Sequence, residues 1–456
     1  MNIYSKTLEK TSTTKRGTRQ LTGGITLLML LAGTASAETN TISGSDTTWV
    51  LVSAALVLLM TPALGFFYGG MVRRKNVIAI ITQCFIIIAL ISLQWAFIGF
   101  TLSFGPDAGH LGLIGGLDWS GLKNVGLAPN PDYSSTIPFL LFMIFQAMFA
   151  IITPALIIGS FADRMKLPSF MAFILAWATF VYAPIAHWMW GTGGWLKNLG
   201  ALDFAGGTVV HMSAGISALA AALIIGKRSE LNSGTDMRPH DITMVILGAG
   251  LLWFGWFGFN AGSALGANGL AVQAFVVTNM AGAAATVSWM AVSWLHNKKP
   301  SSMGIVTGAV CGLAAVTPAS GYISVMASIA IGAIAGVVCY LAVVIMKTWT
   351  RIDDALDVFA CHGIGGTLGV LLTGVFAQKL INPAGADGLL AGSASLMTSQ
   401  LIAVLAVIAY SFIGTVVILK LIDVFMGLRV RKEEEVIGLD LVQYGEEAYP
   451  DMEIPS

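Results

Sequence analysis

The chain has 456 residues, of which 56% are hydrophobic and 11% are charged, and its formal net charge is zero. Soluble proteins carry about a quarter charged residues, so this composition and a mean hydropathy of +0.79 indicate a membrane protein. A chain without net positive charge gives no reason to expect a nucleic-acid partner. The four cysteines lie inside apolar runs and form no CxxC pair, which favours small buried side chains over disulfides or metal ligands.

The first 37 residues have the three parts of a secretory signal peptide. Residues 1–20 are basic, the apolar run ITLLMLLAG follows, and the small residues TASA precede Glu38. The run is shorter than the roughly 20 residues that cross a bilayer. We therefore expect residues 1–37 to be removed after Ala37, with an uncleaved first helix as the alternative.

Eleven apolar segments follow, and polar breaks separate them. Each is interpreted as a membrane-spanning helix, which predicts an all-α polytopic membrane protein. The segments cover residues 48–72, 78–104, 138–161, 168–190, 205–226, 241–262, 271–296, 302–317, 322–347, 355–377 and 397–424. The segment at 302–317 is short.

The basic residues alternate between the breaks in a way that orients the chain. One set of breaks is rich in lysine and arginine, beginning with RRK at 73–75, whereas the opposite set holds only Lys123, Lys197 and Lys379. By the positive-inside rule, the basic breaks are cytoplasmic. The sequence thus predicts a multi-pass protein of the inner (cytoplasmic) membrane, with its mature N-terminus outside and residues 425–456 as a cytoplasmic tail.

Two similar motifs suggest an internal repeat within the membrane domain, residues 38–424. ALDFAGGTVVH at 201–211 opens the fifth span and ALDVFACHGIGG at 355–366 opens the tenth. Each begins Ala-Leu-Asp and places a histidine further along among glycines. Five helices per repeat would invert one repeat against the other, so we expect two inverted five-helix repeats plus one extra helix, with the site at their interface.

Ionisable residues deep in the spans are few, and two histidines stand out. His211 and His362 occur at matching places in the two motifs, and two facing imidazoles can share a proton and offer both a donor and an acceptor. A lone His187 is interpreted as a hydrogen-bonded core residue. With no carboxylate at the same depth and no HExxH or CxxC pattern, no metal site is expected.

Aromatic residues gather near the expected outer ends of several spans. Phe145 and Phe149 are four residues apart on one helix face, Trp190 ends the motif HWMWG, and Phe259 precedes Ser263. Such aromatics are often interfacial anchors. With a hydroxyl beside them, they can instead hold a small cation by cation–π attraction.

Several long motifs resemble the ammonium transporter family (Amt/Mep/Rh), and most closely its bacterial Amt members. They are DFAGGTVVHMSAGISALAAALIIGKR, GWFGFNAGSA, VTPASGYI, DDALDVFACHGIGG and GLRVRKEEEVIGLD. The resemblance covers essentially the whole mature chain. It implies eleven spans, an inverted five-helix repeat and a homotrimer with one pore per subunit.

The resemblance also implies roles for the outer residues. Trp190, Phe149 and Ser263 look like the recruitment site for ammonium. Asp203 looks like the acidic residue beneath that site, which backbone hydrogen bonds hold in similar proteins. Trp190 stands one residue further from Asp203 than in similar members, so the intervening loop is expected to differ.

Below this site the resemblance implies a gate and a lined pore. Phe145, Phe149 and Phe259 look like the aromatic gate, and His211 and His362 look like the twin histidines of the pore. No cofactor is implied. The expected function is capture of ammonium outside, its deprotonation near the gate and passage of ammonia, because an ammonium ion at the bilayer centre is costly.

Two alternatives remain for the function and the tail. The protein could be an ammonium sensor that signals through its tail and transports little, whereas no nucleophile–base pattern supports an enzyme. The tail itself reads either as a solvated, disordered end or, by resemblance, as an ordered strip that binds a PII-type (GlnK-like) regulator. Tyr444 stands where a histidine is familiar in the family, so the details of tail regulation are expected to differ.

Overall fold

The computed structural model describes residues 42–233 and 237–449. The predicted signal peptide, residues 1–37, lies outside this range. Within it the chain is helical, and its only β-type pairings are isolated bridges such as that between Met165 and Arg429.

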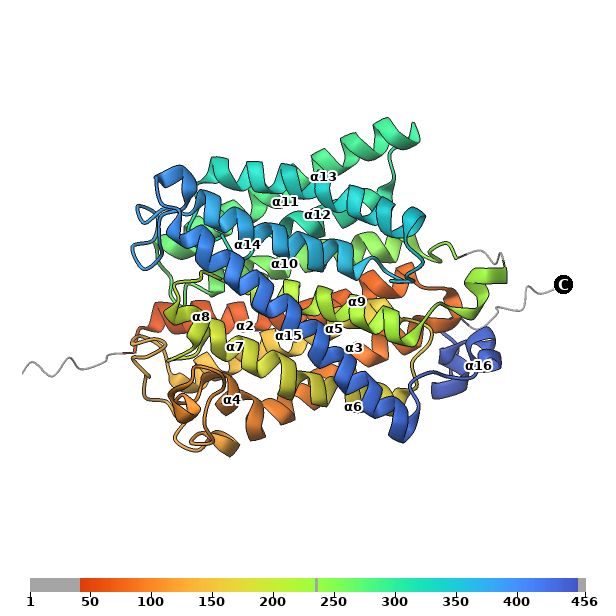
Figure 1. Ribbon diagram of the computed structural model, residues 1–456, viewed down its shortest axis with the longest axis horizontal. Helices are drawn as coiled ribbons and strands as arrows, with labels where there is room; N and C mark the ends of the chain where they lie inside the picture. The colour runs from red at the N-terminus through yellow and green to blue at the C-terminus, as the bar shows by residue number, and fades with distance from the viewer. Residues whose placement is uncertain (1–41, 234–236, 450–456) are drawn as a thin grey trace, which may run out of the picture. The chain divides into compact units, whose positions relative to one another are not determined.

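The structure is built from long helices that are joined by loops and short helical turns (Figure 1). Their bounds are α2 Gly44–Met71, α3 Val77–Gln94, α4 Phe100–Phe104, α5 Phe139–Phe161, α6 Leu167–Trp177, α7 Ala183–Trp190, α8 Trp195–Asn198, α9 Ser213–Ile225, α10 Ile242–Gly262, α11 Gly269–Asn297, α12 Ser302–Val316, α13 Val325–Trp349, α14 Gly365–Phe376, α15 Ser395–Met426 and α16 Lys432–Ile437. Five π-helical turns interrupt or extend them: η2 Trp95–Gly99, η5 Ala178–Tyr182, η6 Gly207–Met212, η8 Phe359–Ile364 and η10 Asp440–Tyr444. Short 3₁₀ turns are η1 Arg74–Asn76, η3 Ala108–His110, η4 Ser120–Leu122, η7 Ser229–Ser233 and η9 Leu389–Ala391.

Ten helical segments of the described chain are long and apolar enough to cross a membrane, and α12 is a shorter apolar eleventh. This agrees with the eleven predicted spans, including the short one at 302–317. The fourth apolar segment, Leu167–Asn198, runs past the predicted end at residue 190 because it includes α8, a separate short helix that follows a break after α7. The fold is thus the expected all-α polytopic one.

The fifth and tenth spans occupy equivalent places in the two five-helix repeats. Each begins with a π turn, η6 or η8, that carries the histidine of its motif. The two segments approach at glycines, since a Cβ on Gly215 would lie 1.9 Å from the backbone nitrogen of Gly363. Only glycine allows this crossing, and it brings both histidines to the interface between the repeats.

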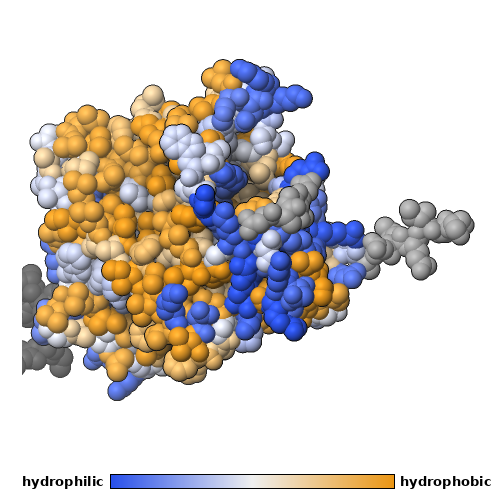
Figure 2. All heavy atoms as spheres, turned by 45° about the vertical axis from the view of Figure 1, so that its right-hand side comes forward, coloured by the Kyte–Doolittle hydropathy of each residue, from blue (hydrophilic) through white to orange (hydrophobic). Residues whose placement is uncertain are grey.

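Polar residues gather at the end of the molecule that carries α16. Figure 2 shows a hydrophilic zone at that end and a largely apolar surface over the helices beside it. This division is what a bilayer requires of the surface of a polytopic protein.

The segment after α15 is folded against the membrane domain. Lys166 donates its backbone N–H to the Leu428 carbonyl at 2.9 Å. The carboxylate of Asp440, in η10, accepts the backbone N–H groups of Ile78 and Ala79 at 3.0 and 2.7 Å, at the start of α3. These contacts order the described part of the tail, up to residue 449, so the disordered interpretation is wrong for it.

Candidate functional site

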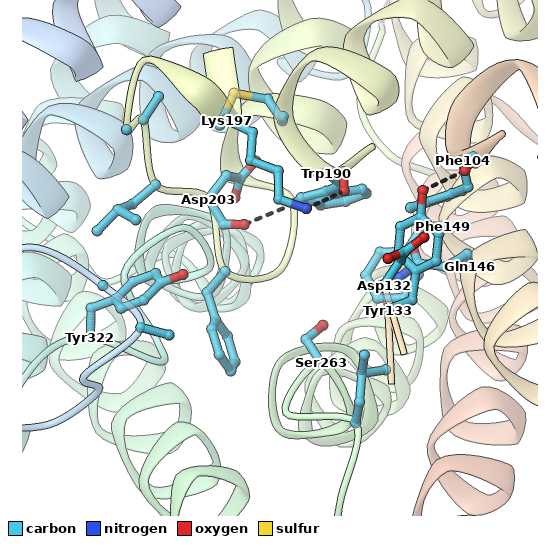
Figure 3. A pocket seen from close by; sticks show the side chains of 18 of the residues that line it. Phe104, Asp132, Tyr133, Gln146, Phe149, Trp190, Lys197, Asp203, Ser263 and Tyr322 are labelled. Carbon is cyan, nitrogen blue, oxygen red and sulfur yellow. Dashed lines mark hydrogen bonds between the residues drawn. The ribbon is translucent and has the colours of Figure 1, made fainter. Parts of the chain in front are cut away.

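A cavity of about 420 Å³ collects the outer residues singled out in the sequence. The short helix α8, whose Lys197 lines this cavity, lies at the end of the molecule opposite α16 (Figure 1). Trp190 reaches it from the end of α7, Phe149 from α5 and Ser263 from the residue that follows α10. Asp203 lines it from the loop before η6. Figure 3 shows these side chains around one space, which we call the vestibule.

The aromatic rings form a connected group at the base of the vestibule. The centroid of the Phe149 ring lies 6.0 Å from that of Trp190, 5.0 Å from that of Phe145 and 4.4 Å from that of Phe259. Phe145, Phe149 and Phe259 are fully buried, whereas Trp190 is partly exposed to the vestibule. The rings therefore close the base and present aromatic surface to a solute above it.

The hydroxyl of Ser263 has a defined orientation. Its Oγ donates to the carbonyl of Phe259, one turn earlier, at 2.8 Å. The hydroxyl proton of Ser263 is thus engaged by the Phe259 carbonyl, and the lone pairs of Oγ can accept a hydrogen bond from a donor in the vestibule. An ammonium ion has N–H donors and no acceptor, so it can donate to this oxygen.

The Asp203 carboxylate is saturated by backbone groups. Gly206 and Gly207 donate to Oδ1 at 2.8 and 2.7 Å, and Thr208 and Val209 donate to Oδ2 at 2.8 and 3.0 Å. These are the free N–H groups at the start of the fifth span, so the side chain caps it.

The backbone of Asp203 adds a second link to the vestibule. Its carbonyl accepts the indole N–H of Trp190 at 2.9 Å. Asp203 therefore positions η6 and Trp190. Both of its carboxylate oxygens already accept two backbone N–H groups each, although the residue lines the vestibule.

Below the rings, the two histidines face each other. The ring centroids of His211 and His362 are 5.2 Å apart, and that of His211 lies 5.7 Å from Phe259 above it. A small enclosed cavity of about 10 Å³ adjoins them, which is room for about one water-sized molecule. The order from outside inward is thus Trp190, Phe149 with Phe259, and then the histidines.

Three of the four imidazole nitrogens lack a hydrogen-bond partner within the described residues. They are Nδ1 and Nε2 of His211 and Nδ1 of His362. Both rings are almost fully buried, at 2% and 3% exposed. Unpaired buried polar atoms are costly, and here they supply donors and acceptors to whatever small molecule occupies the cavity.

Trp256 is a further aromatic residue of the site that the sequence pattern did not select. Its ring lies 5.3 Å from that of His211 and lines the small cavity, and its indole N–H donates to Thr317 Oγ1 at 2.9 Å. Helical spacing could have selected it, because Trp256, Phe259 and Ser263 lie three and then four residues apart on one face of α10.

The structure corrects the register of the internal repeat. The two Ala-Leu-Asp motifs suggest that Asp357 matches Asp203, but Asp354 occupies the equivalent capping position. Its Oδ2 accepts the backbone N–H of Phe359, the first residue of η8, at 2.7 Å. Asp203 and Asp354 also lie equally far, eight residues, before His211 and His362.

At the other end of the path, Asp354 has an unusually high pKa for an aspartate. Burial, followed by the nearby carboxylate of Asp357, raises the pKa of Asp354 to about 7. Its neighbour Asp353 is different, because hydrogen bonds from Arg228 and the charge of Arg164 outweigh the effect of burial and lower the pKa of Asp353. Arg228 binds Asp353 through two nitrogens at 2.8 and 2.9 Å.

His187 has the structural role expected of it. Nδ1 faces the Ser103 carbonyl at 3.1 Å, and Nε2 faces Asp107 Oδ1 at 3.2 Å. No group of three or more metal-ligating side chains occurs in the part of the chain that the structure describes.

Together these features define an integral membrane protein with an aromatic vestibule above a narrow, histidine-lined cavity. A model of the Ammonium Transporter Family matches residues 48–449. The chain belongs to the ammonium transporter family.

Individual relatives agree with this assignment. The chain is 50% identical to an ammonium transporter of Bacillus subtilis over 406 residues, which cover 89% of this chain and 98% of that protein. It is 48% identical to the ammonium transporter Amt1 of Archaeoglobus fulgidus over 408 residues, covering 90% and 100%.

Solved structures share the fold. The crystal structure of Saccharomyces cerevisiae Mep2 matches with a TM-score of 0.81 and 35% identity, covering 87% of this chain and 92% of that one. A structure described as a sensor Amt protein matches with a TM-score of 0.80 and 30% identity, covering 88% and 98%.

Proposed function

We propose that the protein takes up ammonium across the inner membrane by recruiting the ion in the vestibule and conducting ammonia past His211 and His362. The observation that carries this proposal is the sequence of environments along one path. A cation-compatible aromatic site with an acceptor hydroxyl is followed by closed rings and then by a buried imidazole pair without a free carboxylate.

Recruitment rests on two favourable terms. A cation over a desolvated aromatic face is stabilised by about 2 kcal/mol, and a charge-assisted hydrogen bond to Ser263 adds roughly 1.5–3 kcal/mol. The π faces of Trp190 and Phe149 supply the first term. Asp203 contributes by holding Trp190 and the start of the fifth span.

Passage beyond the rings favours the neutral molecule. A bare cation in a buried apolar cavity is strongly disfavoured, whereas ammonia loses little. Ammonium therefore gives its proton to solvent water in the open vestibule above Phe149 and Phe259, and ammonia exchanges hydrogen bonds with the open nitrogens of His211 and His362. Potassium has no proton to lose and is excluded.

The protein's wider organisation is proposed on the same family basis. The signal peptide, residues 1–37, is removed, the membrane domain spans residues 38–424, and three copies assemble into a homotrimer with one pore each. The tail, residues 425–456, lies in the cytoplasm and binds a PII-type regulator.

A second candidate is ammonium sensing with little transport, because a solved structure at 30% identity is described as a sensor Amt protein. The two functions are separated by growth of a transport-null strain on low ammonium. Transport predicts rescue, and sensing alone predicts none.

Uptake across an ammonium concentration series tests the recruitment step. Trp190→Leu should raise the concentration for half-saturation by about ten- to a hundredfold, given about 1.4 kcal/mol per tenfold, and Ser263→Ala should raise it as well. Maximal uptake should change less, because the histidines are untouched. If half-saturation stays in place in both variants, the aromatics are interfacial anchors and the recruitment site must be abandoned.

A further inference from the structure

The segment between Trp190 and Asp203 places a lysine at the edge of the vestibule. Lys197 lies in the short helix α8, and its Nζ donates to the backbone carbonyl of Trp190 at 3.1 Å. The same side chain lines the cavity that Trp190, Phe149 and Ser263 line. Figure 3 shows it extending toward Trp190.

The position of Lys197 is fixed by its neighbours. Leu196 is fully buried, the backbone N–H of Trp195 donates to the Gly112 carbonyl at 3.1 Å, and the side-chain amide of Asn198 donates to the Gly193 carbonyl at 2.9 Å. These contacts fix the backbone of α8, and the bond from Nζ to the Trp190 carbonyl directs the Lys197 side chain toward the vestibule.

Charged side chains of both signs line the vestibule, and Lys197 is the basic one among the described residues that line it. Besides Tyr133 and Tyr322, three ionisable side chains of the described chain line the cavity: Lys197, Asp132 and Asp203. The four backbone N–H groups that bind the Asp203 carboxylate offset part of its field. The Lys197 ammonium is held at the backbone carbonyl of Trp190 and lines the same cavity as the aromatic rings, so an incoming ammonium ion meets a fixed cation in the vestibule.

We propose that Lys197 sets the affinity of the outer site, as a tethered cation that repels ammonium from Trp190 and thereby raises the concentration needed for half-saturation. This inference rests on the proposed function. A residue of this kind keeps uptake responsive at higher ammonium concentrations without changing the gate or the histidines.

Uptake into proteoliposomes, measured as a function of ammonium concentration, tests this role. Lys197→Met keeps the length of the side chain and removes its charge, and it should lower half-saturation about two- to fivefold at an ionic strength of about 0.01 M. Maximal uptake should be unchanged. At about 1 M sodium chloride the difference should shrink toward none, because the Debye length falls to about 3 Å.

Two further variants make the result specific. Lys197→Arg keeps the charge and should keep the half-saturation of the wild type. Lys123→Met removes a cation elsewhere on the predicted outer side, away from the vestibule, and should have no effect.

The outcomes distinguish a failure of this inference from a failure of the proposed function. If the wild type shows no saturable ammonium uptake, the proposed function fails. If the wild type transports but Lys197→Met leaves half-saturation unchanged, or raises it independently of salt, Lys197 only supports the backbone of Trp190 and the inference is wrong.

Discussion

Polar side chains along the proposed path differ in whether their atoms are already occupied. The Asp203 carboxylate accepts four backbone N–H groups, whereas both nitrogens of His211 lack a partner among the described residues. A saturated group holds structure, and an open one can serve a passing molecule. At the scale of residues, this separates Asp203 as a positioning group from His211 and His362 as the groups that line the path.

The histidines should therefore matter for flux more than for stability. His211→Ala and His362→Ala are each expected to reduce ammonium flux about ten- to a hundredfold, because ammonia then crosses a buried segment with one hydrogen-bonding partner fewer, at a cost of about 1–3 kcal/mol. Flux into proteoliposomes and the apparent melting temperature of the purified protein should be measured together.

Cys361→Ala provides the matched control for this pair. Cys361 is adjacent to His362 in sequence, but its side chain packs in the cluster of Cys311 and Cys339. It should lower stability slightly and leave flux intact. Unchanged flux in both histidine variants would contradict the role assigned to the pair.

Asp354 should make stability depend on pH. Its pKa is about 7 in the folded protein, against about 3.9 in an unfolded chain. Between these values the folded state holds a proton that the unfolded chain has lost, so the free energy of unfolding falls as pH rises from about 4 to 7. Above about pH 7 the folded state has also lost this proton, and the free energy of unfolding no longer changes with pH because of Asp354.

Asp354→Asn removes this titration while its side-chain carbonyl can still accept the N–H of Phe359. The variant should match the wild type near pH 4 and be more stable by roughly 1–4 kcal/mol at pH 8. The measurement is the apparent melting temperature of both proteins across this range. Parallel pH profiles would show that Asp354 does not hold the proton.

At the scale of elements, the π turns η6 and η8 carry the two histidines. π turns are rare and often mark functional sites. The sequence predicts apolar helices here but not their wider turns, because segments that are apolar on all sides have no periodicity that would reveal a change of pitch. The equivalence of Asp354 with Asp203 was not predicted, because the two Ala-Leu-Asp motifs pointed to Asp357 instead.

The tail is held by a buried acidic residue in α16. Glu435 is fully buried, accepts the backbone N–H and the hydroxyl of Ser229 at 2.6 and 2.9 Å, and pairs with Arg429 at 2.7 Å. Glu435 is buried while the Arg429 side chain is 28% exposed, so removing the Glu435 charge weakens the pair and leaves partly buried donors without their acceptor. This contact therefore couples the tail to the loop that follows α9.

Glu435→Gln should loosen the tail without unfolding the membrane domain. We expect faster hydrogen exchange over residues 432–449 and unchanged exchange in α9 and α10, measured by mass spectrometry. Glu433→Gln is the control, because Glu433 is exposed on the same helix. Equal protection of the tail in both variants would show that Glu435 does not hold it.

At the scale of the whole molecule, the fold could be predicted because a bilayer imposes length and hydrophobicity on each span. Trp190, Phe149, Phe259 and Ser263 could be selected as well, since aromatics and a hydroxyl at helix ends form a recognisable pattern. The contacts of Asp440 with the start of α3 could not be predicted, because they join residues more than 350 positions apart.

The same limit applies to the vestibule. Lys197 was read only as one of three basic residues in the outer breaks, because its bond to the Trp190 carbonyl depends on how the connecting loop folds. A side-chain bond that closes a loop of this kind leaves no mark in composition or spacing.

The central claim is that the path admits only a cation that can lose its proton. Ammonium and potassium have the same charge and differ in this respect, so the direct measurement is the uptake or current that each produces in proteoliposomes at equal concentrations. The account predicts saturable ammonium uptake with no potassium current above that of protein-free liposomes. A potassium current comparable with the ammonium response would contradict it, because an intact cation would then be crossing the buried histidine segment.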